Sequence, residues 1–491
     1  MPSVAELAPR ANFQENVGND GIPDWFRHAH DGLLMDRYNS ELFLSGLERA
    51  GTGGDEGDLL IMAHRGQLER YQSRWSRLEF ASSDDIPFNP GDSYDIVEGV
   101  IVWRVLKEVG TVRFLQIGAS TRGIPRVEWK MQCPEIFLGF KIDPTSNIFV
   151  TLTPQNNWSS ATITLRTMTD GLPHPKAHQH IIEYDLSATF ASSEWCDELH
   201  INGSRLGVVF RPADPEDNRF FVVVWNWTTG EMVLRLENER RKAIKFLDEY
   251  KILVWEDDDN FLDIYDTSRA PEAGWALSNR ALRLGLPDAI YFDVRMHSGS
   301  NHGSKPAHLE GVVPFFAADS AKIMIINTIT DSDLTKEALG TSIVVFIEDI
   351  LRTFQMMPFG SVMHWEDWGE MTTAFDFRCL PSQTEDERQC FVAGSRFISP
   401  PLGCDLPGFR RLEVYDFNPH YIEFAQATGQ QSLPIMGDGG LKYTKSQIIV
   451  PWREDKTTIA HHLVHLTEDH VIIEDANYPG GSGICSRALS V

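Results

Sequence analysis

The chain has 491 residues, of which 42% are hydrophobic, and its formal net charge is −26. This composition supplies a large core and excludes collagen, coiled-coil and wholly disordered chains. The acidic balance argues against a nucleic-acid-binding surface, because a protein that neutralises phosphates needs clustered lysine and arginine. A basic partner remains compatible with this charge.

The amino-terminal part predicts helices ahead of a β-rich body. Residues 1–25 are polar and are expected to form a mobile tail. Residues 25–49 carry apolar side chains at spacings near three and four, which predicts one or two short amphipathic helices. A further helix is predicted at 59–75, and its apolar face consists of Leu60, Ala63, Leu68, Tyr71 and Trp75. We therefore assign a helical segment to residues 26–82 and a β-rich domain to residues 83–491.

Residues 205–236 contain one complete cycle of short strands and turns. Apolar runs at 206–210 and 220–227 flank a loop of Pro, Asp and Asn, and residues 231–236 alternate after a turn at Gly230. Such alternation around a glycine turn predicts antiparallel hairpins. The unit recurs loosely at 136–168, 244–268 and 396–416, and successive strand ends, at 225–227 and 264–266, lie about 40 residues apart, the length of a propeller blade.

A unit of this size cannot bury a core alone, whereas sheets that stack around an axis bury one another's faces. We therefore predict a mainly β fold: a β-propeller of about seven blades, with six to eight allowed by the length, after a short helical segment. A large β-sandwich or barrel is the alternative. The polar stretches 298–308 and 380–389 are expected to be loops on one propeller face, where ligands commonly bind.

The region from residue 36 to residue 80 resembles the segment that follows the F-box in a large group of fungal F-box proteins. In that family two helices, with Tyr, Glu and Leu in the first and Leu, Tyr and Trp in the second, precede a β-rich substrate domain. The matching residues here are Tyr38, Glu41, Leu42, Leu68, Tyr71 and Trp75. The resemblance continues at residues 94–102, 121–124, 165–175 and 222–236.

The resemblance implies an adaptor whose F-box binds the Skp1 subunit of a cullin ubiquitin ligase and whose propeller-like domain holds a protein substrate. The family's F-box begins with a Leu-Pro pair and carries leucine and isoleucine at helical spacing. Fewer than 40 residues precede Tyr38 here, and Ile22 and Pro23 give the only match. We expect a truncated or degenerate F-box, so Skp1 is a partner only where a remnant of the F-box survives.

Two polar stretches are candidate metal sites. A late run carries four histidines, and a helix would place two of them, four residues apart, on one face for zinc: His461, His462, His465 and His470. Apolar neighbours favour strands instead, and no HExxH motif is present. The acidic run 256–260 fails the calcium-loop pattern, because Leu262 stands where that loop needs glycine. The sequence predicts no metal ion.

Signals for catalysis are weak, and we predict neither catalytic residues nor a cofactor. No GxSxG, GxxxxGK[ST] or GxGxxG motif is present. Ser300 and His302 with Asp293 form a loop pair of a kind that is common by chance. In an enzyme, residues distant in sequence, such as Asp266, Asp416 and one late histidine, would meet in a polar pocket of the central channel.

The stretch MHWEDWGE at 363–370 is the best candidate for a partner-binding surface, which would consist of His364, Trp365, Glu366 and Trp368. Exposed tryptophans anchor peptide partners. Packing between sheets is the preferred alternative for the large rings, among them Trp225, Trp227, Trp255, Trp365 and Trp368.

The sequence as a whole predicts a protein-binding module without catalysis, similar to the substrate receptor of an SCF-type ubiquitin ligase. The alternative is a propeller hydrolase or lyase with a polar site in its central channel. The amino terminus has no apolar stretch after a basic start, and no apolar run approaches the roughly 18 residues of a membrane helix. The six cysteines form no CxxC pair. We expect an intracellular protein, cytoplasmic or nuclear, that does not contact a membrane.

Overall fold

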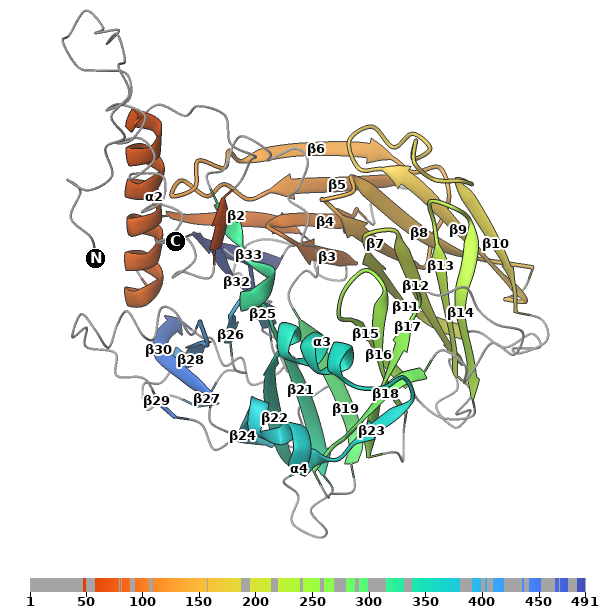
Figure 1. Cartoon of the computed structure of the whole chain (residues 1–491). Helices are drawn as coiled ribbons and strands as arrows, with labels where there is room; N and C mark the ends of the chain where they lie inside the picture. Colours follow the sequence, from red (N-terminus) through yellow and green to blue (C-terminus); the bar gives the residue numbers. More distant parts are fainter. Residues whose placement is uncertain are drawn as a thin grey trace, which may run out of the picture.

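The protein forms a β-propeller, as predicted (Figure 1). Six blades follow one another along the chain and a closing sheet joins its two ends, so the described residues form seven sheets of four or more strands. Both counts lie within the predicted range of six to eight. The computed structural model describes residues 47–49 and 58–490 with gaps at 79, 81, 89–92, 106–107, 109, 157, 187–194, 213–219, 239–241, 257–259, 269–279, 288–290, 299–314, 331–337, 380–390, 399–401, 404–408, 419–434, 437–440, 452–463, 468 and 476–483.

The first three blades are simple antiparallel meanders. They consist of β3 (Tyr94–Val97), β4 (Val100–Arg104), β5 (Thr111–Gln116) and β6 (Val127–Gln132); β7 (Gly139–Asp143), β8 (Ile148–Gln155), β9 (Ser160–Thr167) and β10 (Ile181–Asp185); and β11 (Trp195–Asn202), β12 (Arg205–Pro212), β13 (Phe220–Asn226) and β14 (Glu231–Asn238).

The later blades carry additions. The fourth consists of β15 (Lys242–Phe246), β16 (Lys251–Glu256), β17 (Phe261–Asp266) and β18 (Arg280–Gly285), to which β23 (Ser361–Met363) adds a parallel strand. The fifth consists of β19 (Tyr291–Ser298), β21 (Ile323–Thr330), β22 (Ala338–Phe346) and β24 (Thr372–Cys379). The sixth consists of β25 (Phe391–Ala393), β26 (Arg396–Ile398), β28 (Phe409–Asp416) with the short β27 (Leu402–Gly403), β30 (Lys442–Pro451) and β29 (Ile435–Met436).

The closing sheet pairs strands from both ends of the chain. It consists of β31 (Val464–Leu466), β32 (His470–Asp475), β33 (Ile484–Ser490) and β2 (Ser82–Phe88). Outside the seven sheets, β1 (Leu47–Arg49) pairs with β20 (Phe315–Ala317). The helices are α2 (Asp58–Arg77), α3 (Ile347–Met356), α4 (Trp365–Trp368) and the 3-10 turns η2 (Asp319–Ala321) and η3 (Gly369–Met371). In the described part of the chain, no helix is long and apolar enough to span a membrane.

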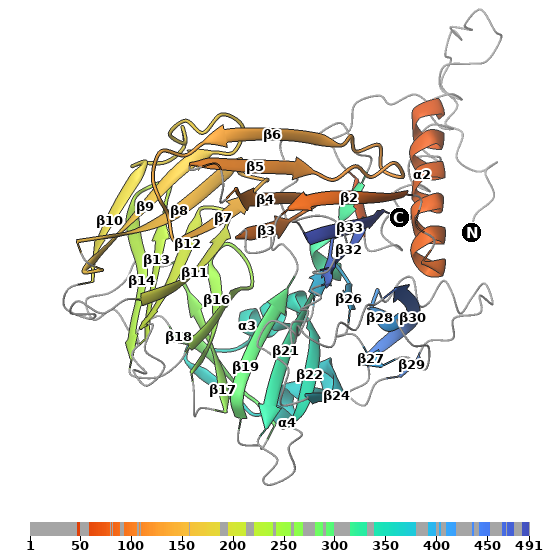
Figure 2. The same ribbon diagram turned by 180° about the vertical axis from the view of Figure 1, so that it is seen from behind.

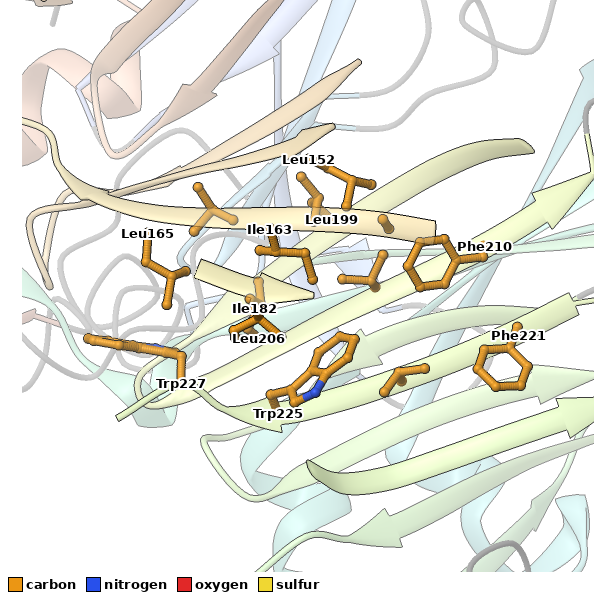
Figure 3. Packing of buried hydrophobic residues seen from close by; sticks show 14 of the residues in the cluster. Leu152, Ile163, Leu165, Ile182, Leu199, Leu206, Phe210, Phe221, Trp225 and Trp227 are labelled. Atoms are coloured by element: carbon orange, nitrogen blue, oxygen red, sulfur yellow. The ribbon is translucent and has the colours of Figure 1, made fainter. Parts of the chain in front are cut away.

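Strand β13 shows why the sheets stack. Alternate side chains of a strand point to opposite faces of the sheet, and β13 is apolar on both. One face packs on the second blade through Phe221, Val223 and Trp225, and the other on the fourth blade through Phe220, Val222 and Val224. Figure 3 shows the first interface, where Phe210 and Trp225 lie among apolar side chains of the second and third blades. Each blade therefore needs a neighbour on both sides.

The ring is completed where the closing sheet meets the first blade. Strand β2 runs antiparallel to β33, the last strand of the chain. Ile86 of β2 and Ile472 of β32 pack with Trp103 of β4 in one buried cluster. At the same interface His470 Nε2 lies 3.1 Å from the carbonyl oxygen of Gly118. The two ends of the chain are thus held together by both sheet pairing and core packing.

The predicted repeat units correspond to observed blades. Residues 205–236 contain β12, β13 and most of β14, and residues 244–268 contain most of β15 together with β16 and β17. The segments 225–227 and 264–266 lie at the ends of the third strands of consecutive blades, which explains their spacing. The acidic run 256–260 lies in the connection between β16 and β17, although 257–259 fall outside the described residues.

Helix α2 packs on the ring through three apolar residues one turn apart. Leu68, Tyr71 and Trp75 are each 5% exposed or less. The guanidinium of Arg396, at the start of β26, lies 4.6 Å from the centre of the Trp75 ring and donates a hydrogen bond of 3.3 Å to the Tyr71 hydroxyl. Its Nε donates to Asp416 at 2.8 Å. Both views show α2 at the side of the ring that holds the closing sheet (Figures 1 and 2).

The helical prediction is confirmed for α2 and is wrong at one point further upstream. Leu47–Arg49 forms strand β1 rather than helix, because it pairs with β20. Ala63, predicted on the apolar face, is exposed, since the contact runs only through the second half of α2. Residues 1–46 lie outside the described residues, and so do most of 298–308 and all of 380–389.

Replacing Arg396 by alanine is expected to loosen α2. The change leaves Asp416 without its cation and removes the charge that packs on Trp75, and breaking such an enclosed ion pair costs about 3–5 kcal/mol. Because about 1.4 kcal/mol corresponds to a factor of ten, amide hydrogen exchange in α2 should rise at least tenfold. Arg352→Ala is the control, since its pairs with Glu348 and Asp349 are exposed. Unchanged exchange in α2 would contradict this account of its docking.

Candidate functional site

The predicted partner-binding residues lie in an insertion between the third and fourth strands of the fifth blade. This insertion, residues 347–371, contains α3, β23 and α4. It crosses to the fourth blade, where β23 pairs in parallel with β18, so that Val362 lies opposite Arg283. We call residues 347–371 the bridging insertion, because it connects the outer parts of two blades.

Trp368 belongs to the packing of this insertion. Its side chain is 0% exposed, and its indole nitrogen donates a hydrogen bond of 2.7 Å to the carbonyl oxygen of Gly285 in β18. Trp365 contacts it edge to face at 5.0 Å between ring centres. A Cβ at Gly285 would lie 3.3 Å from the His364 Cα, so glycine allows this close approach. The buried Trp368 therefore does not contribute its ring to a binding surface.

The other predicted residues stay accessible. His364 and Glu366 are exposed, and Trp365 is half-buried. The backbone N–H of His364 donates to Asp367 at 3.2 Å, which caps the short α4. Binding of a partner at His364, Trp365 and Glu366 stays a prediction.

The bridging insertion also exposes large apolar side chains that the sequence interpretation missed. Met356, Phe359 and Val362 are 71%, 48% and 48% exposed. The opposite side of α3 is buried through Ile347 and Ile350. Apolar residues at helical spacing in α3 could have indicated an amphipathic helix. They follow directly on the apolar residues of β22, so the sequence does not show where the strand ends and the helix begins.

A second polar site lies on the inner strands. The first strand of each blade is innermost, and neighbouring inner strands contact one another around the ring. Charged side chains of alternating sign stand on four successive inner strands: Asp95 on β3, Lys141 on β7, Glu198 on β11 and Lys245 on β15. Lys141 Nζ donates to Asp95 Oδ1 at 2.8 Å, and His200 Nε2 lies 3.1 Å from Glu198 Oε1. We call these five residues the axial cluster.

The axial cluster lies on strands that neighbour one another around the central axis. In addition to burial, the charge of Lys141 in the second blade lowers the pKa of Lys245 in the fourth, and the charge of Asp95 in the first blade raises it. The Glu198 side chain is 54% exposed, so its carboxylate is accessible to water.

Two residues of the axial cluster, Lys245 and Glu198, have shifted pKa values. Burial, followed by the charge of Lys141, lowers the pKa of Lys245 to about 8, while Glu198 and Asp95 oppose the shift. Burial by itself would raise the pKa of Glu198, but His200 and, more weakly, Arg211 and Lys245 outweigh it and lower this pKa to about 2. Glu198 is therefore ionised at neutral pH, and Lys245 is an ammonium that loses its proton more readily than an ordinary lysine.

The residues that an enzyme was predicted to bring together occupy separate local contacts. Asp266 accepts hydrogen bonds from the backbone and hydroxyl of Ser268, in the turn that ends β17. Asp416 pairs with Arg396. His470 bridges the closing sheet to the first blade through Gly118. His461, His462, Ser300 and His302 lie outside the described residues.

No group of three or more potential metal ligands occurs within the described ranges. Cys133 is buried, and burial together with the Glu135 carboxylate raises the pKa of its thiol to about 12. A thiol with such a pKa is a poor nucleophile at neutral pH.

The comparisons with known proteins give structural matches at low similarity. No protein-family model matches the chain, and no curated protein matches it in sequence. The Cps50 (Swd1) β-propeller domain of Myceliophteria thermophila is 8% identical at a TM-score of 0.39, over 83% of this chain and 98% of that one. An uncharacterized protein of Listeria monocytogenes EGD-e is 10% identical at 0.36, over 82% and 99%.

Replacing Trp368 by phenylalanine is expected to lower the free energy of unfolding by about 1–2 kcal/mol, because the carbonyl of Gly285 loses a buried donor. Trp365→Phe is the matched control: its ring is half-buried, so the same change should cost less. Chemical denaturation followed by circular dichroism measures both. Equal losses would show that the hydrogen bond to Gly285 is unimportant.

The pKa of Lys245 predicts a pH dependence of stability. The folded protein releases this proton near pH 8, whereas an unfolded lysine keeps it to about 10.5. The unfolded state thus binds more protons between these values, and the contribution of Lys245 to stability rises with pH across this window. Lys245→Arg, which does not titrate there, should lack the rise. Parallel denaturation curves of both proteins at pH 7 and pH 10 measure it, and the same pH dependence in both would contradict the assignment.

Proposed function

We propose that the protein is a non-catalytic protein-binding module of the substrate-receptor type, in which the segment before the propeller contacts a ligase subunit and the propeller holds a protein partner. The resemblance of residues 36–80 to the segment after an F-box suggests Skp1 as that subunit. The setting of such a receptor is intracellular.

The observation that carries the proposal is the fixed position of α2. A receptor has to hold its substrate at a defined distance from the ligase, so its upstream segment and its propeller need a rigid connection. Arg396 supplies one, since it contacts Tyr71 and Trp75 of α2 and Asp416 of the sixth blade at once. Arg74 of α2 adds a hydrogen bond of 3.0 Å to a loop of the first blade.

The bridging insertion is the surface that fits a protein partner best. Its exposed apolar side chains, Met356, Phe359 and Val362, are followed closely by the exposed acidic residues Glu366 and Asp367. An apolar centre with a charged rim is typical of protein interfaces. A partner segment with apolar residues flanked by lysine or arginine would complement both features.

The rival function, a hydrolase or lyase, receives less support. An enzyme would bring Asp266, Asp416 and His470 together. Here Asp266 bonds to Ser268 in its own turn, Asp416 pairs with Arg396, and His470 contacts Gly118 where the ring closes. These roles are structural, because each group bonds to its own part of the fold. The arrangement supports a binding module more than a hydrolytic centre.

Binding to purified Skp1 tests the proposal. We expect the full chain to retain Skp1 in a pull-down, and a variant with Ile22→Asp and Pro23→Ala, the F-box remnant, to lose it at least tenfold. Val127→Asp is the control, because Val127 is an exposed residue on the outer strand of the first blade and its variant should bind normally. A folded full chain that binds no Skp1 would reject the ligase part of the proposal.

A further inference from the structure

Strand β23 ends the sheet of the fourth blade with an open edge. One edge of this strand pairs with β18, and no strand pairs with its other edge in the described part of the chain. A free sheet edge presents backbone N–H and C=O groups that an added strand can bind. An extended polypeptide satisfies such groups, whereas a helix uses its own donors and acceptors internally. The edge therefore favours a partner in extended conformation.

Exposed apolar side chains lead up to this edge along the bridging insertion. Val362 lies in the middle of β23 and is 48% exposed, while Ser361 and Met363 on either side of it are half-buried. Phe359 is also 48% exposed, and Met356, the last residue of α3, is 71% exposed. A single exposed apolar residue needs no explanation, but three of them next to a free strand edge indicate a contact surface.

The bridging insertion carries an excess of negative charge. Its 25 residues, 347–371, contain five acidic residues and one arginine. That arginine, Arg352, pairs with Glu348 and Asp349 at 3.1 Å each. The other three acidic residues are exposed and have no cation at ion-pair distance among the described residues: Glu366, Asp367 and Glu370. They follow β23 in the chain, so the free negative charge lies after the carboxyl end of this strand.

Two arginines of β18 offset this negative charge only in part. Arg283 lies opposite Val362 in the strand pairing and donates to both carboxylate oxygens of Asp263, at 2.8 and 3.1 Å. Arg280 lies 3.5 Å from the same carboxylate. Two arginines and one aspartate leave one positive charge on this blade, against three free acidic residues after β23. The surface as a whole therefore attracts a basic partner.

We propose that the open edge of β23 binds an extended, basic segment of a protein partner, with lysine or arginine beside Glu366 and Glu370 and apolar residues on Phe359 and Val362. This inference rests on the proposed protein-binding function but not on binding to Skp1. A second copy of this chain does not fit, because each copy has a formal charge of −26 and a symmetric contact would bring the same acidic residues together.

Selection from a phage-displayed library of random dodecapeptides against the full chain tests the proposal. We expect a class of enriched peptides with alternating apolar residues next to lysine or arginine, because alternate side chains of an added strand face the same side. Binding of a synthetic peptide of this class, measured by fluorescence anisotropy, should weaken as salt rises.

Methylation of the peptide's backbone nitrogens, one at a time, identifies pairing with the edge. Neighbouring N–H groups of a strand point to opposite edges, so methyl groups at alternate positions should weaken binding about tenfold and those between them should not. A peptide bound as a helix would instead lose affinity at nearly every position. This series is measured on the unaltered protein and needs no variant to fold.

Variants of the protein locate the contact. Val362→Asp and Glu366→Lys should each weaken binding of the peptide at least tenfold, the first by placing a charge in the apolar centre and the second by repelling the basic residues. Val127→Asp and Glu183→Lys are the matched controls, since both residues are exposed on the outer strands of other blades. Both control variants should bind the peptide normally.

Three outcomes would overturn the proposal. The first is that no enriched peptide loses binding in Val362→Asp. The second is that the peptides that depend on Val362 are acidic, or that they bind Glu366→Lys unchanged. The third is an N-methyl series without alternation. A chain that binds the peptide but not Skp1 would reject only the ligase part of the proposed function, and a chain that binds Skp1 but no such peptide would reject only this inference.

Discussion

A sheet that is apolar on both faces cannot be stable in isolation, because packing one face leaves the other in water. Strand β13 is such a case, with one set of side chains against the second blade and the alternate set against the fourth. Extending this requirement from blade to blade leaves two unsatisfied faces at the ends of the row unless the row becomes a ring. The pairing of β2 with β33 and the burial of Ile86 remove them. The ring and the pairing of its first and last strands therefore both follow from the need to cover both apolar faces of every blade.

Local sequence patterns predict most of the blade strands, but they do not predict the segments that are added to the later blades. The strands at 205–236 and 244–268 were predictable because alternation and turn residues are local. The bridging insertion was not, since β23 joins β18 across a long separation and Trp368 donates to Gly285, 83 residues earlier. Packing was the preferred interpretation of the tryptophans at 363–370, and Trp368 is indeed buried, but no local pattern identifies Gly285 as the residue that it contacts. The blade number was bounded by length but depended on how the two ends of the chain pair.

The polar groups of the candidate sites were also difficult to predict from local sequence patterns. Asp266 and Asp416 were considered because an enzyme would bring acids that are distant in sequence into one pocket. Acids at strand ends also bond to the backbone of their own turns, as Asp266 does with Ser268. The axial cluster was missed because no motif connects Asp95, Lys141, Glu198 and Lys245. Each is an ordinary charged residue in a short strand. Only the ring brings their strands to the same axis, and the pKa of Lys245 is lowered by burial as well as by the charge of Lys141.

One loop of the first blade connects ring closure with the helical segment. Gly118 accepts from His470 of the closing sheet, Arg122 lies 3.0 Å from Asp469, and Thr121 accepts a hydrogen bond from Arg74 of α2. Helix α2 also covers Arg396 of the sixth blade. The helix thus spans the junction at which the last strands of the chain meet the first blade. Because this junction joins the first and last strands of the propeller, a helix packed across it stabilises the ring and is itself oriented by the ring, so α2 and the propeller behave as one body.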